Sequence, residues 1–200
     1  MKNSIRSLLT SVFCSVLVSL FSFGTAASQS TNQQSVPQME SPDQRTGNQL
    51  EAIAKRVRHE MLMLPYYGVF DWLEGEVRPD GSVILRGEVV RPTLKSDAEF
   101  RVKRIESVTN VVSEIRVLPL SPMDDGLRIA LYHAIFYSSL SRYSLGAVSP
   151  IHIIVRNGRA TLKGVVGSEM DKQLAYMSAR GVPGLFDVKN ELMAEYKAAN

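Results

Sequence analysis

The chain has 200 residues, of which 44% are hydrophobic and 22% are charged, fractions that are ordinary for a globular protein. The formal net charge is +3, but removal of Lys2 and Arg6 with the N-terminal segment leaves 21 of the 23 basic residues against 20 acidic ones. This balance gives little support for a nucleic-acid partner. The single cysteine, Cys14, lies in the same segment, and without it the chain has no disulfide, thiol nucleophile or thiolate metal site.

The N-terminal segment has the three parts of a secretory signal peptide. Two basic residues are followed by an uncharged apolar stretch from 8 to 23, and small residues from 25 to 28 suit a signal peptidase. We therefore predict a signal peptide over residues 1–27 and export to the periplasm. The alternative is a retained signal anchor, but the apolar stretch is short for a membrane span and its end is rich in alanine.

Residues 28–48 consist mainly of Ser, Thr, Asn, Gln and Pro and contain scarcely an apolar residue. Because such a segment cannot bury enough apolar surface to fold, we predict a disordered linker. It serves either as a plain spacer or to hold the folded part away from a membrane or wall.

The rest of the chain contains a repeat. Residues 81–89 and 158–166 share the pattern Gly-x-(Ala/Val)-x-Leu-(Lys/Arg)-Gly-x-Val at a separation of 77. Apolar matches continue at this separation, and we predict a register without a gap from about residue 50 to 115 and from 127 to 192. The interpretation is a tandem duplication, with a first module at 49–118, a short linker at 119–123, a second module at 124–194 and a tail at 195–200. Modules this small are marginal alone, so we expect them to pack on each other.

Five elements are predicted in the first module. Apolar residues three and four apart indicate a helix that begins near Leu50 and ends before Pro65. Alternating patterns predict strands at 72–77 and 82–89, joined by a Pro- and Gly-containing turn. A second helix is expected over 93–108 and a last strand over 110–118.

The same five elements are predicted in the second module. Asp124 or Asp125 is expected to cap a helix that continues to about Tyr143. Strands at 151–155 and 159–166 form a hairpin around Asn157-Gly158, a strong two-residue turn signal. A helix over 168–181, with Ser168 as its N-cap, and a strand over 187–194 complete the module.

The predicted fold class is therefore α+β, with two tandem α-β-β-α-β modules. Each hairpin is antiparallel, and the crossover that follows places the last strand parallel to the second. Two helices then cover one face of a three-stranded mixed sheet. We expect Gly87, Gly164, Ala98 and Ala175 to be small because helix and sheet approach closely there.

These features resemble the BON domain family. The resemblance rests on the Gly-x-Val-x-Leu-x-Gly hairpin, the alanine in the following helix and the ending Val-Pro-Gly-x-x-x-Val-x-Asn-x-Leu at 182–192. The first module departs from this ending over 107–115, where the Gly and the Asn are missing. Two such modules behind a signal peptide are similar to osmotically induced periplasmic proteins and related outer-membrane lipoproteins. The resemblance implies an envelope protein that associates with phospholipid, but the motif residues carry over architecture and no lipid contact.

The first helix of the second module has a candidate binding surface. A stripe of aromatic residues and arginines suits anionic headgroups, because rings favour the membrane boundary and guanidinium groups bind phosphate. We predict as lipid-binding residues Arg128, Tyr132, Phe136, Arg142 and Tyr143. The alternative is that these aromatic side chains, with Tyr137, pack against the other module. A rival aromatic patch lies in the first module, at Tyr66, Tyr67, Phe70 and Trp72.

Catalytic and metal chemistry find little support in the sequence. His59, His133 and His152 have no ligand spacing, and we expect ordinary surface or hydrogen-bonded histidines. Asp71, Glu74 and Glu76 could suit a cation or an acid/base pair, but an acidic strand edge that discourages aggregation explains them more simply. Phosphate-binding glycine loops, nucleophile elbows and metal motifs are missing. We therefore expect no enzymatic activity, no cofactor and no bound metal.

Two functions remain as hypotheses. The first is an exported protein that binds phospholipid membrane surfaces, anionic ones in particular, in protection against osmotic or envelope stress. The second is a periplasmic adaptor or chaperone-like protein that binds envelope proteins through a strand edge or the aromatic stripe.

Overall fold

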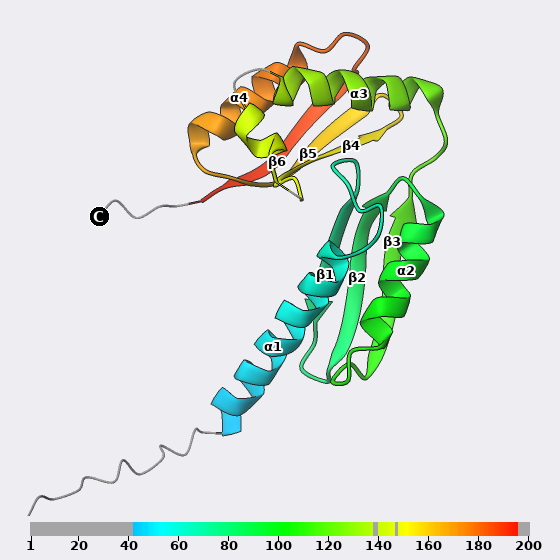
Figure 1. Cartoon of the computed structure of the whole chain (residues 1–200), viewed down its shortest axis with the longest axis vertical. Helices are drawn as coiled ribbons and strands as arrows, with labels where there is room; N and C mark the ends of the chain where they lie inside the picture. Colours follow the sequence, from blue (N-terminus) through cyan, green and yellow to red (C-terminus); the bar gives the residue numbers. More distant parts are fainter. Residues whose placement is uncertain (1–41, 138–139, 147, 196–200) are drawn as a thin grey trace, which may run out of the picture. The chain divides into compact units, whose positions relative to one another are not determined.

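The computed structural model describes residues 42–137, 140–146 and 148–195 (Figure 1). The predicted signal peptide, most of the predicted linker and the end of the tail lie outside these residues. Among the described helices, none combines the length and the apolar character that crossing a membrane requires.

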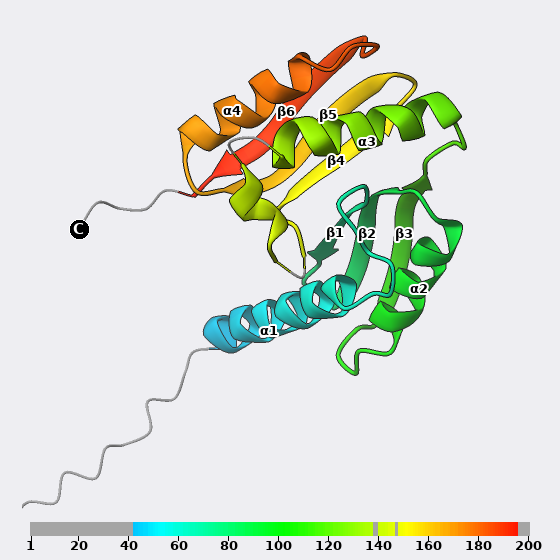
Figure 2. The ribbon, with the colours of Figure 1, turned by 45° about the horizontal axis from the view of Figure 1, so that its top comes forward.

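The first module has the predicted order of elements. It consists of α1 (Pro42–Leu62), β1 (Trp72–Val77), β2 (Ser82–Val89), α2 (Pro92–Lys103) and β3 (Asn110–Val117). The strand order is β1-β2-β3, with β1 antiparallel and β3 parallel to β2. The two helices contact each other and the sheet, and they cover one of its faces (Figure 2).

The second module repeats this arrangement with one additional element. It consists of α3 (Pro122–Phe136), a short 3₁₀-helix η1 (Ser141–Ser144), β4 (Ile151–Arg156), β5 (Arg159–Val166), α4 (Glu169–Arg180) and β6 (Asp187–Ala194). Its strand order is β4-β5-β6, with the same antiparallel and parallel pairings. The predicted fold class, two α+β modules with three-stranded mixed sheets, is confirmed.

The helix ends differ from the prediction more than the strand ends do. Helix α1 begins at Pro42, inside the segment predicted as linker, and α2 ends at Lys103 instead of Val108. Helix α3 is capped by Ser121, whose side chain accepts a hydrogen bond from the Asp124 N–H, and Pro122 occupies its first turn. The expected cap at Asp124 or Asp125 is therefore wrong. Ser168 is the N-cap of α4, as predicted.

The predicted register without a gap is also wrong. Strand pairing opposes Val77 to Val83 and Val155 to Ala160, so the first strands correspond at a separation of 78 while the second strands keep 77. The deeply buried positions of the first helices correspond at 74, as the pairs Ile53 and Leu127, Val57 and Leu131, and Met61 and Ile135. The second module thus has a hairpin turn one residue shorter and a helix–strand connection four residues longer, which contains η1.

Gly87 and Gly164 are required for a reason other than the predicted close approach of helix and sheet. Both have positive φ angles, 137° and 123°. A Cβ atom would lie 1.9 Å from the Trp72 carbonyl oxygen at Gly87 and 2.0 Å from that of Pro150 at Gly164. The close approach is thus to the backbone at the start of the neighbouring strand, and not to a helix. Ala98 and Ala175 are fully buried in the two cores.

The loop before β1 contributes to the second core. Val69 and Phe70 pack against the apolar cluster of the second module. The Ile153 N–H donates to the Val69 carbonyl oxygen at 2.7 Å, so this loop covers the outer edge of β4. His152 lies beside the loop, with its Nδ1 3.2 Å from the Gly68 carbonyl oxygen and its ring against those of Tyr67 and Trp72. The two modules are therefore joined by backbone pairing as well as by side chains.

Candidate functional site

The five predicted lipid-binding residues do not form one exposed stripe. Arg128 and Phe136 are buried, with 3% and 2% of their surface exposed. Tyr132 is half-buried, and Arg142 and Tyr143 lie on η1 because α3 ends at Phe136. The sequence placed all five on one helix. The structure divides them among the core, the contact with the first module and a separate helical turn.

Arg128 and Asp124 fasten the β4–β5 turn to α3. The buried Asp124 carboxylate accepts hydrogen bonds from the N–H groups of Asn157 at 2.9 Å and Gly158 at 2.8 Å. Arg128 donates to the Val155 carbonyl oxygen at 2.8 Å and pairs with Asp125. A buried charge in this setting satisfies backbone groups that would otherwise lack partners, so Arg128 is a structural residue.

Arg142 and Tyr143 clamp η1 to the first turn of α4. Arg142 pairs with the Asp171 carboxylate, and the Tyr143 hydroxyl donates to the same carboxylate at 2.7 Å. The Gly167 N–H donates in turn to the Tyr143 oxygen at 2.7 Å. The Arg142 guanidinium is the main reason that the pKa of Asp171 is held below its usual value. About half of the Arg142 side chain is exposed, so its outer face is accessible from solvent.

Tyr132 and Phe136 pack towards the first module, which is the alternative that the sequence left open, but Tyr137, the third residue of that alternative, is exposed. The rings of Tyr132 and Phe136 lie 4.9 Å apart, and the Phe70 ring meets Tyr132 edge-on at 6.3 Å. A small cavity of about 190 Å³ lies beside them, lined also by Tyr67 and Ser149. The rival aromatic patch of the first module thus belongs largely to the same contact, although Tyr66 is exposed.

Several exposed apolar side chains lie on the outward surface of α3 and α4. Figures 1 and 2 both show these helices side by side over the second sheet, and they contact each other directly. We call their outer surface the two-helix face, and it is formed by Ile129, His133, Tyr137, Met170 and Met177. Ile129 is 52% exposed, and Met170 and Met177 are each 69% exposed. Met170 and Met177 are seven residues apart, so they lie on one side of α4.

The corresponding surface of the first module is less apolar. Lys55 and His59 occupy the positions of Ile129 and His133, and both are exposed. Thr93 stands at the position of Met170, whereas Phe100, at that of Met177, and Met63, at that of Tyr137, are large, apolar and exposed. The predicted stripe and the two-helix face differ by one residue along α3, about 100° around the helix axis. The seven-residue spacing of Met170 and Met177 was the sequence signal that could have identified α4 as part of this face.

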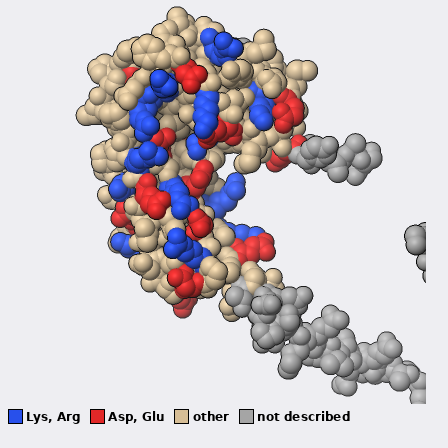
Figure 3. Space-filling model, turned by 180° about the vertical axis from the view of Figure 1, so that it is seen from behind, with Lys and Arg blue, Asp and Glu red and all other residues tan. Residues whose placement is uncertain are grey.

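The acidic cluster of the first hairpin does not form a joint site. The buried Asp71 carboxylate accepts hydrogen bonds from the N–H groups of Val90 at 2.8 Å and Gly68 at 3.1 Å, and burial raises its pKa. Glu74 accepts from the Trp72 indole, and Glu76 pairs with Arg86. Acidic and basic side chains are similarly interleaved on the side of the molecule seen in Figure 3. Each carboxylate thus has its own partner, and within residues 42–137, 140–146 and 148–195 no group of His, Cys, Asp and Glu could hold a metal ion.

The three histidines are separated. His59 and His133 are exposed on α1 and α3, whereas His152 is buried on β4. Burial lowers the pKa of His152, which favours its neutral form.

The comparisons with known proteins concern the fold and the family. No curated protein matches the chain. Two solved structures of CdsD, a structural protein of the Type III secretion system of Chlamydia trachomatis, align with TM-scores of 0.29. One, of its C-terminal domain, is 11% identical and covers 70% of this chain and 96% of that chain, and the other is 12% identical and covers 73% and 94%. The family model of the BON domain matches residues 49–119 and 137–194, most of both modules. The chain therefore belongs to the BON domain family.

Proposed function

We propose that this protein is an exported, non-enzymatic envelope protein that binds anionic phospholipid surfaces through the two-helix face of its second module. The observation that carries the proposal is the group of exposed apolar side chains on α3 and α4, two of which, Ile129 and Met170, have polar counterparts in the first module. Membership of the BON family supports it, because BON domains are associated with phospholipid binding and occur in envelope proteins. The predicted signal peptide supplies the route to the periplasm.

The physical basis is a combination of apolar burial and charge. Burying an exposed Met or Ile side chain completely contributes roughly 1.5–3 kcal/mol, so shallow insertion of Ile129, Met170 and Met177 contributes a few kcal/mol. That is comparable to a single lipid anchor, which binds reversibly. The second module also has 8 basic against 6 acidic residues, whereas the first module has 11 of each. Anionic lipid attracts each nearby cation by about 1 kcal/mol, so the second module is the better suited to an anionic surface.

Of the residues predicted from the sequence, Arg142 and Tyr143 keep a proposed role at the membrane. They lie on η1, near the N-terminal turn of α4, and the Arg142 guanidinium is partly exposed. Arg128, Tyr132 and Phe136 support the face from beneath, because they fix α3 to the β4–β5 turn and to the first module. Protection of the envelope under osmotic stress is the physiological setting that we propose for this binding.

Sedimentation of the purified protein with vesicles tests the proposal. We expect co-sedimentation with anionic vesicles at low salt and weaker binding to neutral ones. Ile129→Glu together with Met177→Glu should reduce the bound fraction at least tenfold, because two charges would have to enter the interface. Met193→Glu is the matched control, since Met193 is exposed on the opposite side of the same module. Equal binding by all three proteins, or no binding to anionic vesicles, would exclude this face.

A polypeptide-binding adaptor is the second candidate. The observation that favours it is β6, which pairs within the described residues only with β5 and therefore leaves one edge open, whereas the edge of β4 is covered by Val69. An adaptor should bind an unfolded client in the absence of lipid. It should also lose that binding on Ala194→Pro, which removes an N–H that faces away from β5, while vesicle binding is unchanged.

A further inference from the structure

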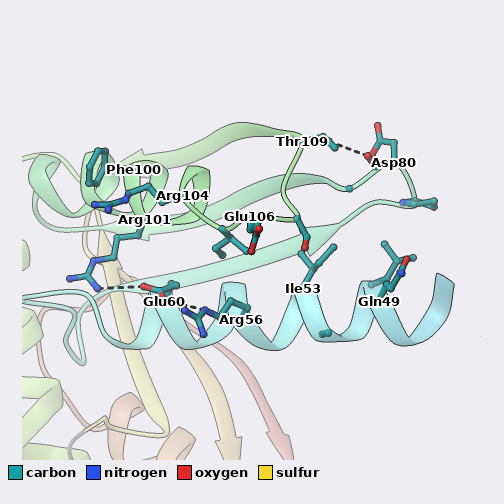
Figure 4. Close-up of a pocket in the computed structure, with 16 residues that line it drawn as sticks. Gln49, Ile53, Arg56, Glu60, Asp80, Phe100, Arg101, Arg104, Glu106 and Thr109 are labelled. Carbon is teal, nitrogen blue, oxygen red and sulfur yellow. Dashed lines mark hydrogen bonds and ion pairs between the residues drawn. The ribbon is translucent and has the colours of Figure 1, made fainter. Parts of the chain in front are cut away.

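An open groove of about 1130 Å³ lies in the first module, on a surface distinct from the two-helix face (Figure 4). Its long walls are α1 and α2, and its far end is closed by the β1–β2 turn and by residues 105–109. The close-up shows side chains from both helices directed towards the space between them. The volume is at the upper end of the range for small-molecule sites.

One end of the groove is cationic. Arg56, Arg101 and Arg104 line it together with a single carboxylate, Glu60. Glu60 pairs with the Arg101 Nη1 at 3.4 Å and the Arg56 Nε at 3.5 Å. One carboxylate cannot satisfy three guanidinium groups, each of which carries five N–H donors. This end therefore has a net charge of +2 and donors arranged to bind an oxyanion.

The rest of the groove has an apolar floor between polar side chains. Ile53 forms part of its floor, with Leu50 and Ile105 beside it, and the exposed ring of Phe100 stands at the cationic end with the Arg104 guanidinium 5.4 Å from its centroid. Asp80 lies at the far end, where its carboxylate accepts hydrogen bonds from the N–H and hydroxyl of Ser82 within the turn. Glu106 is the third carboxylate in the lining after Glu60 and Asp80, and it opposes an anionic ligand.

The second module closes the equivalent space. There Asp124 binds the turn N–H groups directly, and a Cβ atom on Gly158 would lie 2.6 Å from the Phe186 ring. The first module has Leu50 at the position of Asp124 and Thr109 at that of Phe186, so its helix is not fastened to the turn and no aromatic ring fills the gap. The groove of the first module therefore lies where the second module has these two contacts.

We propose that this groove binds a single anionic amphiphile, with its acidic head group at the arginine end and one hydrocarbon chain along Ile53 and Leu50. A bare anion would leave the apolar floor in water, and a neutral amphiphile would leave the guanidinium groups without an oxyanion. The ligand is one molecule that enters the protein, whereas the proposed membrane binding lays a face of the protein on a bilayer. The two sites share no residue.

Calorimetric titration with octyl phosphate, below the concentration at which it forms micelles, tests this site. We expect binding by the whole protein, at least tenfold weaker binding of inorganic phosphate, and at least tenfold weaker binding of the neutral octyl glucoside. Arg104→Glu should weaken octyl phosphate binding about tenfold, because one charge-assisted contact is replaced by repulsion. Glu106→Gln should strengthen it.

Matched variants separate a loss of ligand contacts from a general change in charge or a loss of folding. Lys103→Glu makes the same change of charge on α2 outside the groove and should leave affinity within about twofold, because exposed charges are screened by salt. Ala52→Trp, an exposed position on the lining, should block binding by filling space without removing a charge. The urea midpoint of each variant shows that it is folded. Equal affinity for phosphate and octyl phosphate, or equal losses in Arg104→Glu and Lys103→Glu, would overturn the proposal.

The two-helix face provides the last control. Ile129→Glu with Met177→Glu should abolish vesicle binding and leave octyl phosphate affinity unchanged. Loss of octyl phosphate binding in this variant would place the amphiphile on the second module and refute the groove. Failure of the unaltered protein to bind anionic vesicles, with octyl phosphate binding retained, would refute only the proposed membrane face.

Discussion

The two modules agree in their sheets and differ in how their helices are used. Both keep the same strand pairings and the same glycine at the crowded start of the hairpin. In the second module Asp124 and Arg128 draw α3 onto the turn, and an apolar surface faces outward. In the first module the helix leaves a groove, and its outer surface has Lys55 and Thr93 in place of Ile129 and Met170. After a duplication, the residues that maintain the fold are constrained in both copies, so differences in function are to be sought on the helices.

The largest effects should come from the feature that the modules share. Gly87→Ala and Gly164→Ala each force a Cβ atom onto a backbone oxygen at a positive φ angle. We expect each to lower the free energy of unfolding by about 4 kcal/mol, the sum of backbone strain and overpacking. Urea denaturation measures this, with Gly126→Ala as a control, because Gly126 has open space around it. A small effect at only one of the two glycines would break the equivalence of the sheets.

The next largest loss of stability should be greater in the second module than in the first. Asp124→Ala removes the acceptor for two turn N–H groups, one of them buried, and we expect a loss of about 2–3 kcal/mol in the free energy of unfolding. Leu50→Ala, at the equivalent position of the first module, should cost about 1 kcal/mol, since Leu50 is only partly buried. Equal losses in thermal or urea denaturation would contradict the difference in how the two helices are fastened.

Exchanging outer-surface residues between the modules tests how helical side chains affect membrane binding. Lys55→Ile with Thr93→Met gives the first module apolar residues at the positions of Ile129 and Met170. If exposed apolar side chains on the helices determine membrane binding, this variant should bind anionic vesicles severalfold more strongly than the original protein, by about 1 kcal/mol. The exchange of Ile129→Lys with Met170→Thr should do the reverse. Unchanged binding in both variants would show that helical surface chemistry does not determine membrane binding.

The smallest expected effect concerns pH. His152 on β4 stands where β1 has Glu74, and burial lowers its pKa below the usual value of 6.5. The unfolded chain therefore takes up a proton first as the pH falls, so His152 contributes fully above about pH 6.5 and its contribution is lost below that pH. The difference in urea midpoint between about pH 7.5 and about pH 5.5 should shrink in His152→Phe. An unchanged difference would mean that His152 titrates equally in both states.

Strands were the most predictable part of the molecule. Strict alternation and a turn signal fixed 72–77, 82–89, 159–166 and 187–194 to the residue, because a half-buried strand has only two faces. The helices were less predictable. Apolar residues lie around most of α3, so periodicity did not identify which face is buried, and Arg128 was taken as exposed although it binds the Val155 carbonyl. The connections that differ in length have no periodic pattern. The sequence therefore did not reveal that the first helices of the two modules correspond at a separation of 74 residues.

Because Val69 covers the edge of β4, the second module depends on a segment of the first. The sequence repeat ends at the linker 119–123, but the second sheet is completed by a segment from the other side of that linker. A fragment cut at residue 119 would lose two apolar side chains from its core and expose a strand edge, which invites pairing with other chains. The boundary of the duplicated gene segment and the boundary of the cooperative folding unit therefore lie at different places.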